Sequence, residues 1–193
     1  MKAAHNIFYA HGFGNVAPWF DLANSEEWDG FGKRTDHLND REWLAAFWKH
    51  WKLAPISFDS PSRRRLQDLR ELLRRAAQKL AAGHSLGTGE ITKLNHALNV
   101  PVRQRLVQRQ NGWRAELLPI QRDGNWTLAQ IAASLAETLA GQNAERVRIC
   151  ANADCRWIFH DPTKAGTKRW CNDRTCGNRA RVRRARAAQK RSA

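Results

Sequence analysis

The sequence predicts a mainly α-helical protein with one β-hairpin, of the α+β class, followed by a small metal-binding module with a basic helix. Apolar residues recur at helical spacing in several stretches, and two strand-like runs flank an Asn-Gly pair. All four cysteines lie within the last 44 residues. We therefore expect a helical domain over residues 1–141 and a second module over residues 142–193.

The first clear helix is expected over residues 40–53. Asn39 can cap it, Trp43 opens a wide apolar stripe at helical spacing, and Pro55 stops it. The preceding segment is rich in glycine and aromatic residues, and residues 20–25 fit either a short strand or a helical turn.

Two further helices are expected before the hairpin. Ser60 and Pro61 are a capping residue and a proline at the first helical position, and leucines at helical spacing continue until Gly83. Thr88 is the expected cap of a shorter helix that ends before Pro101.

The hairpin is expected over residues 102–120, with its turn at Asn111-Gly112. A last core helix is expected over residues 127–140. The joint that follows, residues 142–149, contains no Pro/Gly/Ser-rich stretch. We therefore expect the metal module to dock on the helical domain instead of tumbling independently.

Positive charge is concentrated at the end of the chain, whose formal net charge is +15. Residues 146–193 carry 14 of the 33 Lys+Arg residues but only 3 of the 18 Asp+Glu residues. Such a polycation favours a polyanionic partner, meaning DNA, RNA or an acidic membrane surface. No segment approaches the roughly 18 apolar residues of a membrane span, and the amino terminus lacks the apolar core of a signal peptide. We expect a cytoplasmic protein with reduced thiols.

The cysteines form two pairs of equal spacing, Cys150 with Cys155 and Cys171 with Cys176. Each pair can supply two thiolates from a tight turn, as a tetrahedral zinc ion requires. The alternatives are two disulfides, which a reducing compartment disfavours, or four unrelated buried thiols. His160 lies between the pairs and is an alternative ligand, although four thiolates already complete a site. We expect one structural Zn²⁺ per chain, with no open coordination position for catalysis.

Zinc would also fold a module that has few apolar residues of its own. Structural zinc contributes about 10 kcal/mol or more of apparent folding free energy in zinc-finger peptides. We expect residues 148–159 to form a hairpin with the first cysteine pair at its tip. The second pair is expected to open a helix that runs to about residue 189, which gives a treble-clef-like geometry.

The expected terminal helix carries a stripe of cations. Arg179, Arg183, Arg186 and Lys190 fall within about 60° of one another at 100° per residue, and such a stripe suits the phosphates of a duplex. Val182 and its neighbours on the remaining side are expected to pack inward. A surface that docks on protein and a solvated tail are the alternatives. The residues expected to contact nucleic acid are Lys168, Arg169, Arg174, Arg179, Arg181, Arg183, Arg184, Arg186 and Lys190.

The segment Cys176-Gly177-Asn178-Arg179 resembles the name motif of the CGNR zinc-finger family of bacterial proteins, and residues 148–186 resemble its flanking pattern. The finger of that family usually follows an ABATE-type, stress-induced transcription-regulator domain. Asp21-Leu22-Ala23-Asn24-Ser25 resembles an early motif of that domain more loosely. The resemblance implies a nucleoid-associated DNA-binding regulator whose helical domain senses a small-molecule effector. RNA binding and protein docking remain alternatives, and the oligomeric state is open.

Seven of the nine tryptophans lie before residue 127 and fit either a core stripe or a ligand pocket, of which helical spacing favours the core. Asn24 and Arg34 are the candidates for a buried polar pair or a small-ligand contact. Asn24 rests on the motif resemblance, and Arg34 on its setting between Gly32 and Asp36. Five polar residues could in principle form an acid/base or metal site, but no catalytic spacing links them, so we do not expect an enzyme: His11, Asp36, His37, Asp40 and His50.

Overall fold

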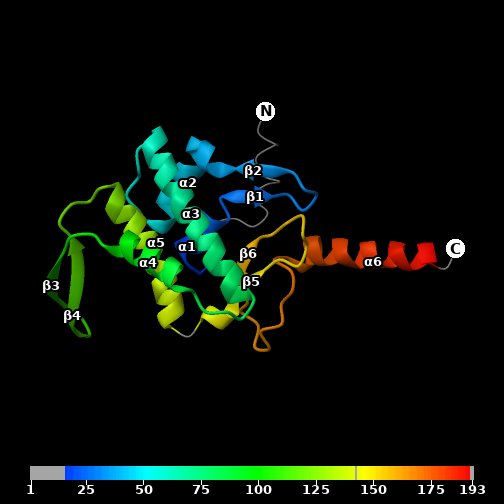
Figure 1. Cartoon of the computed structure of the whole chain (residues 1–193). Helices are drawn as coiled ribbons and strands as arrows, with labels where there is room; N and C mark the ends of the chain where they lie inside the picture. The colour runs from blue at the N-terminus through cyan, green and yellow to red at the C-terminus, as the bar shows by residue number, and fades with distance from the viewer. Residues whose placement is uncertain (1–15, 142, 192–193) are drawn as a thin grey trace.

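A computed structural model describes residues 16–141 and 143–191 of the chain. The helices of the main body are α1 (Pro18–Ala23), α2 (Arg41–Trp51), α3 (Ser60–Ala81), α4 (Thr88–Leu98) and α5 (Gly124–Ala140). Three antiparallel pairs of strands are formed by β1 (Glu26–Trp28) with β2 (Arg34–Asp36), β3 (Val102–Arg109) with β4 (Gly112–Pro119), and β5 (Val147–Ile149) with β6 (Ile158–His160). The last helix is α6 (Asn178–Arg191), and Figure 1 shows it extending away from the body. The expected α+β class with a terminal basic helix is confirmed.

Aspartates begin three of the long helices, because a carboxylate accepts hydrogen bonds from the first free backbone N–H groups. Asp40 caps α2, Asp59 caps α3 and Asp123 caps α5. The predictions that Asn39 and Ser60 are the caps were therefore each wrong by one residue. Each displacement has the same cause, since an aspartate next to the predicted residue has the extended backbone that a cap requires.

The remaining boundaries follow local chemistry. Residues 18–23 form a helix, which settles the choice between strand and helical turn. Helix α4 starts after Gly87, whose N–H donates to Glu90, so the expected cap Thr88 is already inside the helix. In the β3–β4 hairpin Arg109 pairs with Gly112, so the turn is residues 110–111 and not Asn111-Gly112. Gly112 has a φ of 118°, which only glycine adopts readily.

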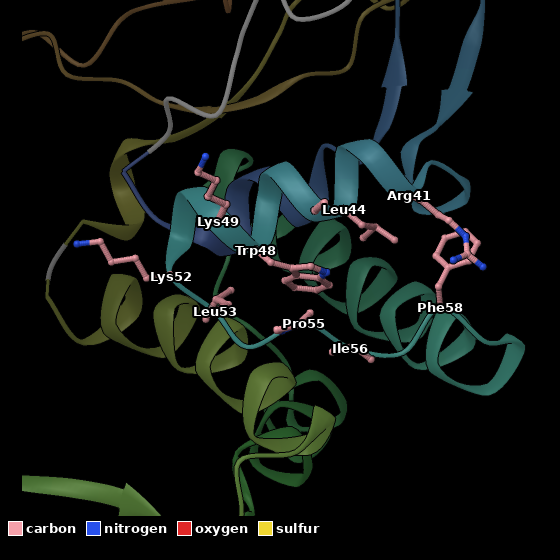
Figure 2. Close-up of a pocket in the computed structure, with 10 residues that line it drawn as sticks. Arg41, Leu44, Trp48, Lys49, Lys52, Leu53, Pro55, Ile56 and Phe58 are labelled. Carbon is pink, nitrogen blue, oxygen red and sulfur yellow. The ribbon is translucent and has the colours of Figure 1, made fainter.

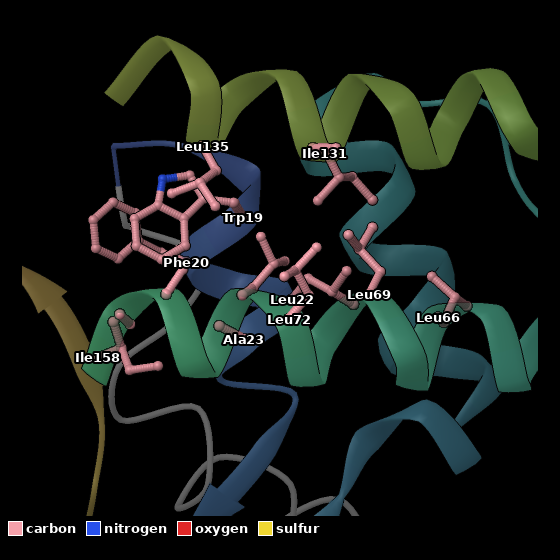
Figure 3. Packing of buried hydrophobic residues seen from close by; sticks show 14 of the residues in the cluster. Trp19, Phe20, Leu22, Ala23, Leu66, Leu69, Leu72, Ile131, Leu135 and Ile158 are labelled. Carbon is pink, nitrogen blue, oxygen red and sulfur yellow. The ribbon is translucent and has the colours of Figure 1, made fainter. Parts of the chain in front are cut away.

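The main core lies between α1, α3 and α5 (Figure 3). Trp19 and Phe20 of α1 stack at a centroid distance of 3.8 Å, and Leu135 of α5 packs into the same cluster. The Trp19 indole N–H donates to the Thr138 hydroxyl at 2.9 Å, so its single polar group is satisfied. Trp43 and Trp48 of α2 are also buried, so the core interpretation is confirmed for these three tryptophans, whereas Trp113 is exposed.

The core continues across the expected boundary at residues 141–142. Val147 of β5 and Ile158 of β6 are almost fully buried within the helical cluster. The hairpin of the cysteine module is therefore packed against the helices, as the short joint predicted.

Candidate metal centre and nucleic-acid interface

The four cysteines converge on one point. Cys150 follows β5, Cys155 lies in the connection to β6, and Cys176 lies in the π-helical turn Asp173–Gly177 that leads into α6. All four sulfur atoms lie within 4.8 Å of one another. The Cys171 Sγ is 3.7 Å from that of Cys155 and 3.8 Å from that of Cys176. A tetrahedron with Zn–S bonds of about 2.3 Å has edges of about 3.8 Å, so this donor set fits tetrahedral zinc.

The proton chemistry of the thiols points to the same need for a cation. The thiol of Cys155, as a hydrogen-bond donor, lowers the pKa of Cys150. Hydrogen bonding to Cys150 and Cys155 raises the pKa of Cys171, because its proton is shared with those sulfur atoms. Four thiolates therefore coexist only when a cation replaces the shared protons. In the described chain the group of metal-compatible ligands holds the four cysteines and not the alternative ligand His160.

Backbone turns present the ligands. The Cys150 N–H donates to the Trp157 carbonyl at 2.8 Å, which closes the connection between β5 and β6. Arg156 in that connection has a φ of 55°, a left-handed conformation that reverses the chain. On the other side, Asn172 accepts hydrogen bonds from the N–H groups of Arg174 and Thr175 and so begins the turn that carries Cys176. The expected combination of a hairpin and a helix start is confirmed.

A buried carboxylate organises the basic loop before Cys171. Asp161 is fully buried and accepts hydrogen bonds from the Thr163 N–H and hydroxyl and from the Lys168 N–H. Burial opposes its ionisation, but these hydrogen bonds lower the pKa of Asp161 to about 2. The carboxylate therefore stays ionised, and it fixes the loop between the two cysteine pairs.

Asn24 joins the helical body to the cysteine module. Its side-chain amide donates to the Ile158 carbonyl at 2.7 Å and accepts from the Ile158 N–H at 2.9 Å. The residue is almost fully buried. Both polar groups of the Asn24 side chain, the NH2 donor and the oxygen acceptor, are therefore used to hold β6 in place. The other candidate, Arg34, has a half-exposed side chain and pairs with Glu26 and Asp36.

A second contact holds the base of α6. Asn152, which lies between the first two cysteines, donates to the Gly30 carbonyl and to the Cys176 sulfur atom, and it accepts from Arg183. The Gly30 N–H donates to the Asp154 carbonyl at 3.0 Å. Gly30 has a φ of 82°, and a Cβ at this position would collide with the guanidinium of Arg179. The loop between β1 and β2 therefore packs against both the cysteine cluster and α6.

Three of the predicted nucleic-acid contacts are engaged within the protein. Arg179 donates to the Asp29 carbonyl and lies 4.0 Å from the centre of the Phe31 ring. Arg181 pairs with Asp173 at 3.1 Å, and Arg183 pairs with Asp154 at 2.7 Å. These arginines fix the base of the helix. Sequence periodicity could not reveal this for Arg179 and Arg183, because their partners come from other segments of the chain.

The other predicted contacts divide into two groups. Lys168 lies over the Phe159 ring and Arg169 over the Trp170 ring, each at 5.3 Å from the ring centre. The remaining four are exposed, and the described part of the chain offers their side chains no hydrogen bond or ion pair: Arg174, Arg184, Arg186 and Lys190. Residues 181–190 are exposed around the whole helix, so the expectation that Val182 and its neighbours pack inward was wrong. The helix projects beyond any surface that would cover them (Figure 1).

Polar residues of the helical domain have separate structural partners. Asp36 binds Arg70 through both oxygens, and although burial opposes it, this pairing lowers the pKa of Asp36. His37 contacts Glu27 at 2.8 Å, and Asp40 caps α2. His11 lies outside the described residues. Asp36, His37 and Asp40 therefore each have a partner within the fold that accounts for them structurally.

The domain also has surface hollows. A groove of about 550 Å³ beside α2 is lined by Trp48, Pro55 and Ile56, with Arg41 stacked on Phe58 at one end (Figure 2). Lys49 and Lys52 also line it, but Figure 2 shows their amino groups pointing away from Trp48. A larger hollow of about 1130 Å³ lies at the base of the β3–β4 hairpin.

Comparison with known families gives two matches. Residues 17–142 match the ABATE model, described as "Putative stress-induced transcription regulator", and residues 146–189 match the CGNR zinc finger. No curated protein matched the chain. No helix of the described chain is long and apolar enough to cross a membrane. The first match covers well over half of the chain, and the second coincides with the cysteine cluster and α6. The chain therefore belongs to the ABATE family of regulators and carries a carboxy-terminal CGNR zinc finger.

Proposed function

We propose that this protein is a regulator of transcription that binds double-stranded DNA through α6 and its zinc finger. The observation that carries the proposal is the helix itself: it projects from the body, it is exposed on all sides from residue 181, and no acidic residue follows Asp173. A cationic helix without a covering surface fits the major groove, which is about 12 Å wide and flanked by phosphates.

The cations of α6 would divide between positioning and contact. Arg179, Arg181 and Arg183 bind protein groups and fix the direction of the helix. Arg184 and Arg186 lie about 200° apart around the helix, at 100° per residue. Lys190 lies on the same side as Arg186. Cations on both flanks suit the two phosphate strands that border a groove.

One zinc ion per chain, held by Cys150, Cys155, Cys171 and Cys176, would have a structural role. Four sulfur ligands leave no open position, so the metal supplies folding free energy and no Lewis-acid chemistry. Its contribution to binding is indirect, because Cys176 directly precedes the residues that begin α6.

The helical domain would set the orientation of α6. The contacts of Asn152 and Arg179 with the loop between β1 and β2 provide a direct physical connection. The 1130 Å³ hollow lined by His96 and Trp126 has the volume to hold a small effector, and neither Asn24 nor Arg34 lines it. An effector would regulate DNA binding only if it bound two orientations of the finger with different affinity.

Salt-dependent DNA binding tests this proposal. Affinity for a labelled duplex, measured by fluorescence anisotropy across a salt series, should fall steeply as salt rises. Replacing Arg186 and Lys190 by alanine should reduce the slope of log affinity against log salt by about two units, at about 0.9 per phosphate contact.

The matched control replaces Arg103 and Arg114, on the distant β3–β4 hairpin, by glutamine. It removes the same charge and should leave the slope within about half a unit, because those residues lie outside the proposed contact. Absence of binding at low salt, or an equal effect of both double variants, would contradict the proposal. A preference for RNA over duplex DNA would move the function to RNA metabolism.

A further inference from the structure

The β3–β4 hairpin has two chemically different faces. Cross-strand pairing places Gln104 opposite Leu117, and Leu106 opposite Ala115, so alternate residues of both strands share a face. One face carries Val102, Leu106, Trp113 and Leu117, with glutamine, alanine and proline at its other positions. We call it the apolar hairpin face. The opposite face carries Arg103, Arg105, Arg109 and Arg114, and its single acid, Glu116, pairs with two of them.

The apolar hairpin face is uncovered. Leu106, Trp113 and Leu117 are each between 63% and 68% exposed, and Val102 is 39% exposed. The hairpin projects from the body at the end opposite α6 (Figure 1). Two strands alone are marginally stable in water, because they lack a third strand or a helix against which to bury an apolar face. Adjacent exposed apolar side chains of this size commonly mark an interaction surface.

We propose that two copies of the chain pair through this face to form a two-fold symmetric dimer. Two copies of a chain with a net charge of +15 repel each other. Electrostatic repulsion is weakest when they meet through this face, because it carries no ionisable residue. When two such faces meet, the arginine faces point outward into solvent. An acidic partner would instead be drawn to the arginines on the opposite face, so the neutral face selects a neutral, apolar occupant.

The available area suits a weak dimer. Eight residues at about 3.4 Å each give a face about 27 Å long. Because side chains project from both strands, two such faces bury at most on the order of 1,000 Å² together, the lower limit for a specific interface. A two-fold arrangement uses the same face twice, so each apolar side chain finds an apolar counterpart. The α6 helices remain exposed at the two far ends of the dimer.

Sedimentation velocity of the full-length, zinc-loaded protein tests the dimer. A concentration series should show a monomer–dimer equilibrium that strengthens as salt rises, because salt screens the repulsion between two cationic chains. Leu106→Glu should weaken dimerisation by about tenfold or more, since it buries an unpaired charge. Arg103→Gln, which lowers the net charge by the same amount on the opposite face, should leave the equilibrium unchanged or slightly strengthened.

A second variant, Trp113→Gln, removes the largest apolar side chain without adding charge and should also favour the monomer. Circular dichroism and zinc content should be unchanged in each variant, because these side chains lie far from both cores. A monomer at every concentration would overturn the proposal, as would a dimer that tolerates both variants or that weakens with salt. A chain that stays monomeric but binds a different protein through this face would assign the face to that protein and equally overturn the dimer.

Discussion

The two buried clusters of this protein are stabilised by different physics. The helical core is large and apolar, and it is built mainly from residues of α1 to α5, together with Val147 of β5 and Ile158 of β6. The cluster in the finger consists of three buried cysteines and Phe159, with Trp157, Trp170 and Cys171 packed beside it. A core of that size cannot offset its chain entropy, so it requires a metal. The comparison teaches that one chain can join a large apolar core to a small metal-dependent cluster through one hairpin, β5–β6, whose residues pack into both.

Metal removal should have the largest effect and should separate the two clusters. Replacing Cys171 by serine, or removing zinc with a chelator, should abolish about 10 kcal/mol of metal-dependent folding free energy. Hydrogen exchange should rise over residues 150–177, while the helices of the main body keep their circular dichroism signal. His160→Ala should retain one zinc ion per chain in metal analysis. Loss of the main helices together with the metal would show that the two clusters fold as one unit.

Adjacent residues of β6 sharpen the comparison, because Ile158 packs into the helical core and Phe159 into the finger cluster. Ile158→Ala should destabilise the helical domain by about 2–5 kcal/mol through the cavity that it leaves. Phe159→Ala should weaken zinc binding and leave the urea unfolding of the helices nearly unchanged. Equal loss of helical stability in both variants would contradict the division.

A smaller effect is expected at the polar contact between the two regions. Asn24→Ala leaves both backbone groups of Ile158 unpaired in a buried setting, and this should cost about 1–3 kcal/mol of unfolding free energy. Arg34→Ala, at an exposed ion pair, should cost at most about 1 kcal/mol. Urea denaturation of the zinc-loaded variants would measure both changes. A larger loss for Arg34→Ala would assign that residue a role that its contacts do not explain.

Local chemistry predicted much of the fold and the metal ligands. Helical spacing identified the long helices. The predicted caps of α2, α3 and α4 were each wrong by one residue, and α5 begins at Gly124, three residues before the predicted start at residue 127. The spacing of the cysteines predicted their convergence. What lies against α6 was not predictable, because the partners of Arg179 and Arg183 are Asp29 and Asp154, which are distant in sequence. The contacts of Asn152 were also missed; the sequence feature that could have pointed to them is its position as a polar residue between Cys150 and Cys155.

The amide of Asn24 has a consequence for the evolution of the family. It binds the main chain at position 158 and not a side chain, so the contact does not depend on which amino acid stands there. At position 158 the side chain is then constrained only by the volume that it fills. At position 24 the side chain must offer one hydrogen-bond donor and one acceptor at a fixed distance from the backbone. Aspartate lacks the donor, and glutamine is one methylene longer. The two positions should therefore drift independently among relatives, and a search for correlated substitutions would overlook the contact.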